Sequence, residues 1–562
     1  MKQPPLPQRV VYVVSHSLPY SSNGYAVRSH AVATALSELG HEVVVINRPG
    51  RPWSIEGFDP ARTIPTDQRI DGVRYLFLPL GAAPEDGQRA RLRAAENVLA
   101  ETFDILRPGC VIAASNWENA EPAQNAARRY GCAFFYEQRG FWDMARGETD
   151  SALSEADAVA AKRSRDYETR IARDARAAFT LGTAMKEEMV RRGVPAERIH
   201  LMPNGVSDPR PGGAPLSRAD LGITARHLLG YIGSLSSYEG LELLVEATAR
   251  LRGEGVDAAL LVVGSDTPKG LVDADAASPR ARALADLAAT RGIAAHVHLV
   301  PQQPQSRIGS YTRLLDAFVM PRRRSDMTQI VPPIKPYSAA SYGVPVLMTD
   351  MPPLDEVAQD IGAALFAEGD AAALATALRA TFEREASGAA ELRPGLRWTH
   401  RVRPLSRLLQ GEAQALASAA AQGVTGHQTR PQHAGFDITR LPQVALGQQR
   451  GTLAYLGPET APTDPRYDAT RRVQLTRSNI LAELATRAPG VFLVDWPALR
   501  ATGNPDWDGL WSIDDMRLNR LMMTATRIAT ERGWQCHVAG PIQRSAAPLF
   551  RTVSQVFEEI VP

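Results

Sequence analysis

The sequence predicts an α/β protein in which two doubly wound parallel-sheet domains stand in tandem, followed by a small C-terminal α/β module. Short apolar runs alternate with amphipathic helical stretches over the first 205 residues, which is typical of a parallel sheet covered by helices. A second alternating stretch begins near Leu228, and a third ordered segment follows a polar stretch. A chain of 562 residues also exceeds what one hydrophobic core usually holds.

The first domain is predicted over residues 1–205. A helix is expected at Ala26–Leu39, where the apolar spacing is helical and Gly40 is a natural C-cap. The expected strands are the apolar runs Val10–Ser15, Glu42–Asn47, Val73–Leu78, Cys110–Ala114, Ala133–Tyr136, Ala178–Leu181 and His200–Pro203.

The second domain is predicted over residues 206–420. Its expected strands are Leu228–Ile232, Ala259–Val263, Val297–Val300, Ala317–Met320 and Val344–Met348. The expected helices are Leu241–Leu251, Ala276–Thr290, Ser306–Leu315, Ile334–Tyr342 and Ala371–Glu385.

The C-terminal part of the chain changes in character. Residues 421–450 are small and polar, which predicts a linker. Residues 451–562 are predicted to form an accessory module, with strands at Val491–Val494 and Gln535–Val538 and a helix at Ile513–Arg532.

Composition narrows the function classes. Hydrophobic residues make up 44% and charged residues 22%, and a net charge of +2 argues against a nucleic-acid partner. No uncharged apolar stretch reaches the length of a membrane span, and the N-terminus is too short for a secretory signal, so a cytoplasmic location is expected. Arg89, Arg91 and Arg93 are expected to form a solvated helix face, with peripheral contact to anionic lipid at the inner face of a membrane as the alternative.

Ligands of open parallel sheets bind beyond the carboxyl ends of the strands, which directs attention to four loops. In the first, Asn23, Gly24 and Tyr25 lead into a helix, so the loop either offers backbone N–H groups to a ligand or is a plain turn. In the second, Glu137 and Arg139 stand beside aromatic residues, which suits a sugar ring but equally suits a structural ion pair.

The other two loops belong to the second domain. Gly230–Gly240 is rich in glycine, which lets backbone approach a ligand closely or makes a strand-to-helix turn. Met320–Gly343 carries several cations, which suit a diphosphate, although a solvated basic turn is the alternative. Its cations are Arg322, Arg323, Arg324 and Lys335. No metal-ligand spacing is present, so neither a metal ion nor another cofactor is expected.

These loops resemble, in order, those of the bacterial family-4 glycosyltransferases. The similar stretches are VVYVVSHSLPYSSNGYAVRSHAVATALSELGHEVVVINRPG, FFYEQRGFWD, FTLGTAMKEEMVRRGVPAERIHLMPNGV, GYIGSLSSYEGLELLVEA, RLLDAFVMP and IKPYSAASYGVPVLMTDMPPLDE, which lie between Arg9 and Gln410. The resemblance implies the GT-B fold, two Rossmann-like domains that face each other across a cleft, with a C-terminal helix returning to the first domain.

The resemblance also implies an activity and the residues that would bind each substrate. The activity is retaining transfer of a sugar from a nucleotide-diphosphate sugar to a glycan, lipid-linked or similar acceptor, as in polysaccharide biosynthesis. The acceptor would bind Asn23, Gly24, Tyr25, Glu137 and Arg139. The donor would bind Gly233, Ser234, Arg322, Arg323, Arg324, Gln329, Lys335 and Ser338.

Four donor-site positions depart from the family pattern. Ile330 and Ser338 stand where two glutamates are usual, and Ser234 and Glu239 stand where an arginine and a lysine hold the diphosphate. Either the cations of Met320–Gly343 supply the missing charge while Gln329 or Ser338 bonds the sugar or ribose, or catalysis is lost and the chain is a binding or scaffolding subunit in glycan assembly. No catalytic residue is assigned.

The C-terminal module allows two interpretations. Carboxylates among tryptophans could form a sugar-binding or hydrolytic site: Asp495, Asp506, Asp508, Asp514, Asp515, Trp496, Trp507 and Trp511. Alternatively, Ser512 caps a helix and the tryptophans cover a core. The structural interpretation is favoured, which predicts a module that modulates acceptor choice or assembles with a protein partner.

Overall fold

The structure is a computed structural model that divides into two compact units. The larger unit comprises Leu6–Glu96 and Pro108–Gln414, and the smaller comprises Met1–Pro5, Asn97–Arg107 and Ala415–Pro562. The structure describes residues 4–55, 58, 64–80, 87–145, 154–207, 216–266, 278–384, 393–425, 452–456, 471–495, 507, 516–539 and 558–560.

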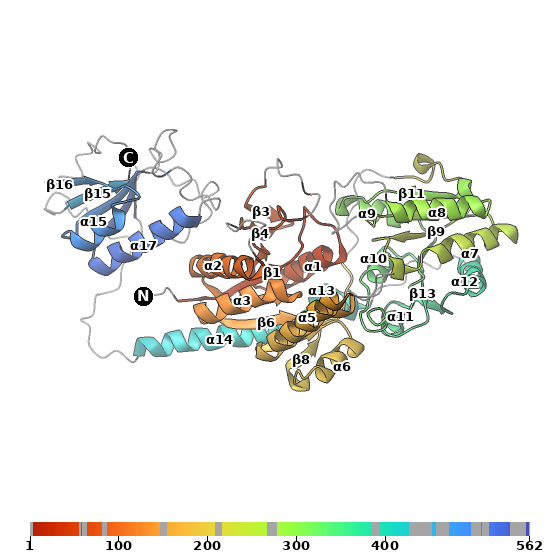
Figure 1. The fold of residues 1–562 in the computed structure, drawn as a ribbon, viewed down its shortest axis with the longest axis horizontal. Coiled ribbons are helices and arrows are strands. Elements are labelled where there is room, and N and C mark those ends of the chain that lie inside the picture. Colours follow the sequence, from red (N-terminus) through yellow and green to blue (C-terminus); the bar gives the residue numbers. More distant parts are fainter. Residues whose placement is uncertain are drawn as a thin grey trace. The chain divides into compact units, whose positions relative to one another are not determined.

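The first domain of the larger unit is built on an 8-stranded sheet in the order β3-β4-β2-β1-β5-β6-β7-β8, parallel except for the antiparallel edge pair β3 and β4 (Figure 1). Its strands are β1 (Leu6–Val14), β2 (Glu42–Asn47), β3 (Asp67–Ile70), β4 (Val73–Phe77), β5 (Pro108–Ala114), β6 (Ala133–Glu137), β7 (Ala177–Thr180) and β8 (Ile199–Leu201). The helices between them are α1 (Gly24–Glu38), α2 (Gln88–Leu106), α3 (Trp117–Tyr130), α4 (Trp142–Ala145), α5 (Glu155–Asp174) and α6 (Thr183–Arg191), with the turn η2 (Ala196–Arg198). The second half of α2, from Asn97, is assigned to the smaller unit.

The second domain has a 6-stranded parallel sheet in the order β11-β10-β9-β12-β13-β14. Its strands are β9 (His227–Ile232), β10 (Ala258–Val263), β11 (Val297–Val300), β12 (Ala317–Met320), β13 (Val346–Thr349) and β14 (Ala364–Phe366). The helices are α7 (Glu242–Gly253), α8 (Pro279–Thr290), α9 (Gln305–Thr312), α10 (Lys335–Ser341), α11 (Leu354–Ile361) and α12 (Ala371–Glu383). Short turns are η3 (Ala219–Leu221), η4 (Ser237–Glu239), η6 (Ala294–His296) and η7 (Pro394–Leu396).

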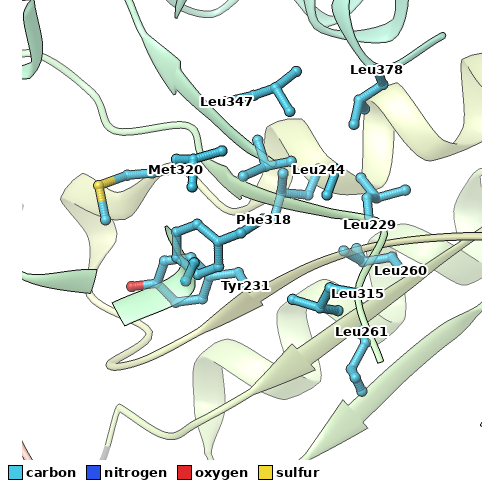
Figure 2. Close-up of a cluster of buried hydrophobic side chains, with 14 of the residues drawn as sticks. Leu229, Tyr231, Leu244, Leu260, Leu261, Leu315, Phe318, Met320, Leu347 and Leu378 are labelled. Carbon is cyan, nitrogen blue, oxygen red and sulfur yellow. The ribbon is translucent and has the colours of Figure 1, made fainter. Parts of the chain in front are cut away.

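The core of the second domain lies between its sheet and the flanking helices. Figure 2 shows Leu229 and Tyr231 of β9 beside Phe318 of β12, with Leu244 of α7 and Leu378 of α12 close by. The rings of Tyr231 and Phe318 stack with their centroids 6.0 Å apart. This packing fixes the ends of β9 and β12 relative to each other.

The chain returns to the first domain after the second, as the resemblance implies. Val206 pairs with Arg397 in a parallel bridge, and α13 (Trp398–Arg401) and α14 (Arg403–Thr425) follow. Leu405 and Leu409 of α14 are buried in one cluster with Tyr12 of β1. The returning helix is therefore part of the first domain's core.

The smaller unit contains a five-stranded parallel sheet in the order β16-β15-β17-β18-β19. Its strands are β15 (Thr452–Leu456), β16 (Arg471–Gln474), β17 (Val491–Asp495), β18 (Gln535–Ala539) and β19 (Glu558–Ile560), with helices α15 (Ile480–Thr486) and α17 (Met516–Arg532). Trp507 is buried in the core, and its indole N–H donates to the Leu475 carbonyl at 3.0 Å. This tryptophan has the structural role that the sequence favours.

The other members of the predicted carboxylate and tryptophan group, apart from Asp495 at the end of β17, lie outside the described residues: Asp506, Asp508, Asp514, Asp515, Trp496 and Trp511. Among the helices of the described part of the chain, none has the length and apolar character needed to cross a membrane.

Candidate functional site

The strand order of the second sheet reverses between β9 and β12, and ligands of doubly wound sheets bind at such a switch point. Gly233 and Ser234 follow β9, and Arg322 follows β12 at the same edge of the sheet. The predicted donor loops therefore meet at the place where this architecture binds ligands.

Glycine is required where these loops pack. Gly233 has φ +155°, and a Cβ built on it would lie 2.3 Å from Cε of Lys335. Gly240 has φ +66°, and a Cβ there would lie 2.3 Å from the Pro321 carbonyl oxygen. The Arg323 backbone N–H also donates to the Tyr238 carbonyl at 2.8 Å, so η4 is held against the end of β12.

Glu239 gathers two cations at this edge. Its Oε1 accepts from Nζ of Lys335 at 2.6 Å and from Nη2 of Arg322 at 3.2 Å. Arg322 also donates to the Val331 carbonyl at 3.1 Å, which ties it to the loop before Lys335. We call Glu239, Arg322 and Lys335 the donor-edge cluster.

The donor-edge cluster is buried except at Lys335. The side chain of Glu239 is 0% exposed, that of Arg322 7% and that of Lys335 19%. Burial by itself raises the pKa of Glu239, but the charges of Lys335 and Arg322 outweigh it and hold that pKa below its usual value. The carboxylate is therefore ionised. Burial lowers the pKa of Lys335, although the charge of Glu239 opposes this shift. With Lys335 protonated, the cluster carries one net positive charge that is accessible at Lys335.

The remaining predicted donor residues do not join this cluster. Arg323 pairs with Glu242 at 3.1 Å, and Arg324 pairs with Glu368 at 2.8 Å. Gln329 donates to the Ser325 carbonyl at 3.3 Å, and Ser338 lies in α10. Of the cations predicted to supply the missing charge, the structure brings together Arg322 and Lys335 only.

At the first sheet, the predicted acceptor residues Glu137 and Arg139 form a buried network. The Glu137 carboxylate accepts from Arg28 at 2.8 Å, from Arg139 at 2.8 Å and from the Tyr12 hydroxyl. Burial raises the pKa of Glu137, but the charges of Arg139 and Arg28 lower it to about 2. Glu137 is 1% exposed and Arg139 3%, so the geometry favours the structural alternative for this pair.

The loop after β1 faces the second domain. The Asn23 side chain accepts the Ala26 backbone N–H at 3.0 Å, which makes it the N-cap of α1. A Cβ on Gly24 would lie 3.2 Å from Cγ2 of Ile334, the neighbour of Lys335. Ser22 accepts from Gln302 of the second domain at 2.9 Å. Asn23 therefore has a structural role, and the loop lies close to the donor edge.

Aromatic side chains lie in both of these loops and in the loop after β6. Tyr25 stacks on Trp142 with centroids 5.5 Å apart. Burial and the neighbouring Tyr238 of the second domain raise the pKa of Tyr25, so these two rings lie near each other. Arg322 in turn lies 5.6 Å from the Tyr238 ring centroid. Trp142 is one of the aromatic residues that the sequence places beside Glu137 and Arg139, whereas Tyr238 was not singled out.

Sequence reasoning also missed two residues at the carboxyl edge of the first sheet. His16 follows β1 and Arg51 follows β2, and Nη1 of Arg51 lies 2.8 Å from Nε2 of His16. The ring centroids of His16 and Tyr25 lie 6.4 Å apart, so this pair adjoins the aromatic side chains. A charged residue just beyond a predicted strand was the available signal.

Arg89 and Arg93 of α2 line a cavity of about 210 Å³ with residues of α3 and α5, including Trp117 and Tyr167. Both arginines are exposed, as expected for a solvated helix face. Within the described ranges, no group of three or more histidine, cysteine, aspartate or glutamate residues is placed to hold a metal ion.

Comparison with known families identifies the family of the chain. Residues 23–205 match the family described as glycosyl transferase 4-like domain, and residues 215–393 match glycosyl transferases group 1. The chain belongs to the glycosyltransferases that carry these two domains in tandem. Both matches fall in the larger unit except for Asn97–Arg107, and the second contains the whole donor-edge cluster.

Curated relatives match over part of their length. A D-inositol 3-phosphate glycosyltransferase of Nocardia farcinica is 28% identical over 182 residues, which cover 32% of this chain and 38% of that relative. A protein of the same name from Rhodococcus opacus is 30% identical over 145 residues, which cover 25% of this chain and 31% of the relative. The chain thus matches under two fifths of either relative.

Solved glycosyltransferase structures share the fold. Sucrose-phosphate synthase of Thermosynechococcus elongatus gives a TM-score of 0.51 at 16% identity, over 75% of this chain and 100% of that one. The catalytic domain of starch synthase IV of Arabidopsis thaliana, bound to ADP and acarbose, gives 0.51 at 14% identity over 73% and 99%. These likenesses establish the GT-B fold of this glycosyltransferase family member.

Proposed function

We propose that the protein transfers a sugar, with retention of configuration, from a nucleotide-diphosphate sugar to a glycan, a lipid-linked or a similar acceptor. The donor-edge cluster carries this proposal, because it places one net positive charge at the switch point of the second sheet. In such a transfer, the bond between the anomeric carbon and the diphosphate breaks, and the leaving diphosphate gains negative charge that a fixed cation stabilises.

Lys335 is suited to bind the diphosphate. An ammonium group has three N–H donors, and Glu239 accepts one of them at 2.6 Å, which leaves the others for phosphate oxygens. Arg322 is buried and bonded to Val331 and Glu239, so we propose that it positions Lys335 through the shared carboxylate. The positive charge usual at positions 234 and 239 would then come from positions 322 and 335.

The loop after β1 supports an acceptor site opposite the donor. Tyr25 and Trp142 present stacked rings next to Tyr238 of the second domain, and aromatic faces suit the C–H faces of a sugar. We propose that the acceptor lies along these rings.

Titration calorimetry with UDP, GDP, ADP and their sugars tests the donor site. We expect one nucleotide to bind at millimolar concentration or below, and Lys335→Ala to weaken it about tenfold or more, as loss of a charge-assisted hydrogen bond predicts. Lys162→Ala is the control, because Lys162 is 78% exposed and pairs only with Asp166 among the residues that the structure describes. Failure of every nucleotide to bind would remove the basis of the proposal.

A further inference from the structure

The strand order of the first sheet also reverses, at β1 between β2 and β5, so this sheet has its own switch point. Arg51 and His16 lie at that edge. The backbone of their loop is fixed, because Arg48 N–H donates to the Val14 carbonyl and Gly50 N–H to the Leu78 carbonyl, both at 2.7 Å. The position of the Arg51 guanidinium is therefore built into the sheet edge.

Arg51 has no carboxylate partner in the part of the chain that the structure describes. Its Nη1 donates to the Ser15 carbonyl at 3.2 Å and contacts Nε2 of His16 at 2.8 Å. Burial, with the nearby charge of Arg48, lowers the pKa of Arg51 to about 10. Burying a guanidinium without a directly bonded carboxylate costs free energy, which a bound anion would offset.

The one carboxylate near Arg51 in the described chain is already used. Glu118 accepts from Arg48 at 2.9 Å through Oε2 and from Gln88 at 2.5 Å through Oε1. Glu118 pairs directly with Arg48 and attracts Arg51 only at longer range, so among the described residues no carboxylate is bonded to the Arg51 guanidinium.

Buried polar atoms without partners surround the same edge. Ser17 and Asn47 are 1% and 2% exposed, yet Ser17 Oγ and Asn47 Oδ1 have no hydrogen-bond partner among the described residues. Asn116, the N-cap residue of α3, makes no side-chain cap bond to that helix. Unsatisfied buried polar atoms are rare in native proteins, so these atoms are expected to bond to water or to a polar group of a ligand.

We infer that the acceptor carries an oxyanion, a phosphate monoester or a carboxylate, and that Arg51 binds it at the carboxyl ends of β1 and β2. The inference rests on the proposed transferase function and specifies its acceptor class. Arginine presents a planar fork of donors that matches both oxyanions. The Nε2 of His16 accepts from Arg51, because a guanidinium only donates, so His16 orients the fork. The anion would lie beside Tyr25, on which the rest of the acceptor would rest.

Calorimetry on the full chain tests this with glucose, glucose 6-phosphate and glucuronate as probes at fixed salt, in the presence of the nucleotide that binds. At least one anionic probe is expected to bind about tenfold or more tightly than glucose, as charge-assisted hydrogen bonds predict. Whether the phosphate or the carboxylate probe shows the preference identifies the anion. Arg51→Gln is expected to abolish this preference while nucleotide affinity stays unchanged.

Two further variants keep the test decisive. Arg51→Lys retains the positive charge but lacks the planar fork of donors, so it should keep part of the preference for the anionic probe. It serves as the test variant if Arg51→Gln fails to fold. Arg74→Gln is the matched control, because Arg74 is a partly buried arginine that pairs with Asp67 at 2.7 Å on the β3 and β4 edge. The Arg74→Gln variant should keep the full preference for the anionic probe.

The outcomes separate the two claims. A wild type that binds nucleotide but shows no anion preference, or an Arg51→Gln variant that keeps the preference, would overturn the inference and leave the transferase proposal standing. A wild type that binds no nucleotide would overturn the transferase proposal, and the anion site would then be judged from Arg51→Gln without nucleotide.

Discussion

The buried carboxylate of Glu239 accepts from both Arg322 and Lys335. Glu239→Gln would leave Arg322 and Lys335 without their anion, and Arg322 is buried. We expect the free energy of unfolding to fall by about 3–5 kcal/mol, the range for breaking a buried ion pair. Chemical denaturation measures this change.

Glu242→Gln is the matched control for that variant. Glu242 pairs with Arg323 at 3.1 Å and with Arg280 at 3.0 Å, and all three side chains are partly or largely exposed, so the substitution should change stability by about 1 kcal/mol or less for each pair. Equal effects of the two substitutions would show that Glu239 is not the anchor of the donor-edge cluster.

Glu168 of α5 predicts a pH dependence. Burial raises the pKa of its carboxyl to about 8, whereas an unfolded glutamate has a pKa near 4.3. The folded state therefore binds the Glu168 proton more tightly than the unfolded state does. The contribution of Glu168 to stability is thus greatest below pH 4.3 and declines as the pH rises from there to about 8. The full decline is at most roughly 4–5 kcal/mol.

Glu168→Gln should remove this contribution, because glutamine does not titrate. Thermal unfolding of both proteins at pH 5 and pH 8 measures it: the variant should lose less stability than the wild type on going to pH 8. An identical pH dependence in the two proteins would contradict the assignment. Glu137, whose pKa is about 2, has the opposite sign and loses its contribution only in acid.

At the scale of elements, the turn from β9 to η4 decides whether Lys335 can approach the switch point. Gly233→Ala would place a Cβ 2.3 Å from Cε of Lys335 and so displace it. We expect nucleotide affinity to fall about tenfold or more, as for loss of the lysine contact itself.

Gly222→Ala separates backbone strain from this close approach. Gly222 has φ +68° with nothing within 4 Å of its Cβ position, so it should cost about 1–2 kcal/mol of stability and leave nucleotide affinity unchanged. Nucleotide titration of both variants checks the pair, and equal affinities would show that Gly233 does not protect the position of Lys335.

Most strands of the two large sheets could be predicted, because buried parallel strands are continuous apolar runs such as Val10–Ser15 and Ala259–Val263. β3 and β14 were missed. β3 has the sequence DQRI and lies at the sheet edge, where burial does not select apolar residues. β14 lies at an edge of the second sheet and is only three residues long, so it is too short to show a hydrophobic pattern.

The candidate site was predictable where a residue type follows a strand and less so where tertiary pairing decides. Arg322 and Lys335 were found because cations cluster after Met320. The pairing of Glu239 with these two cations could not be predicted, because they lie 83 and 96 residues away from it along the chain. For Glu137 and Arg139 the sequence allowed a sugar site or a structural ion pair, and it did not show that Arg28 of α1 would bond to Glu137 in the same buried network.

At the scale of the whole molecule, the smaller unit has its own sheet and its own buried cluster. A protein truncated at Gln448 is therefore expected to fold and to bind nucleotide with the affinity of the full chain, because the donor-edge cluster lies in the larger unit. Circular dichroism and calorimetry test this. An insoluble product, or one that has lost nucleotide binding, would show that the C-terminal segment is integral to the GT-B body.

The central claim is that Lys335, held by Glu239, makes this chain an active sugar transferase. The most direct measurement is release of nucleoside diphosphate from nucleotide sugars by the purified full chain, with and without acceptors supplied as cell extract. We expect release that depends on the extract, is lost in Lys335→Ala and is unchanged in Lys162→Ala. Nucleotide that binds without any release, or release that Lys335→Ala leaves unchanged, would contradict the account.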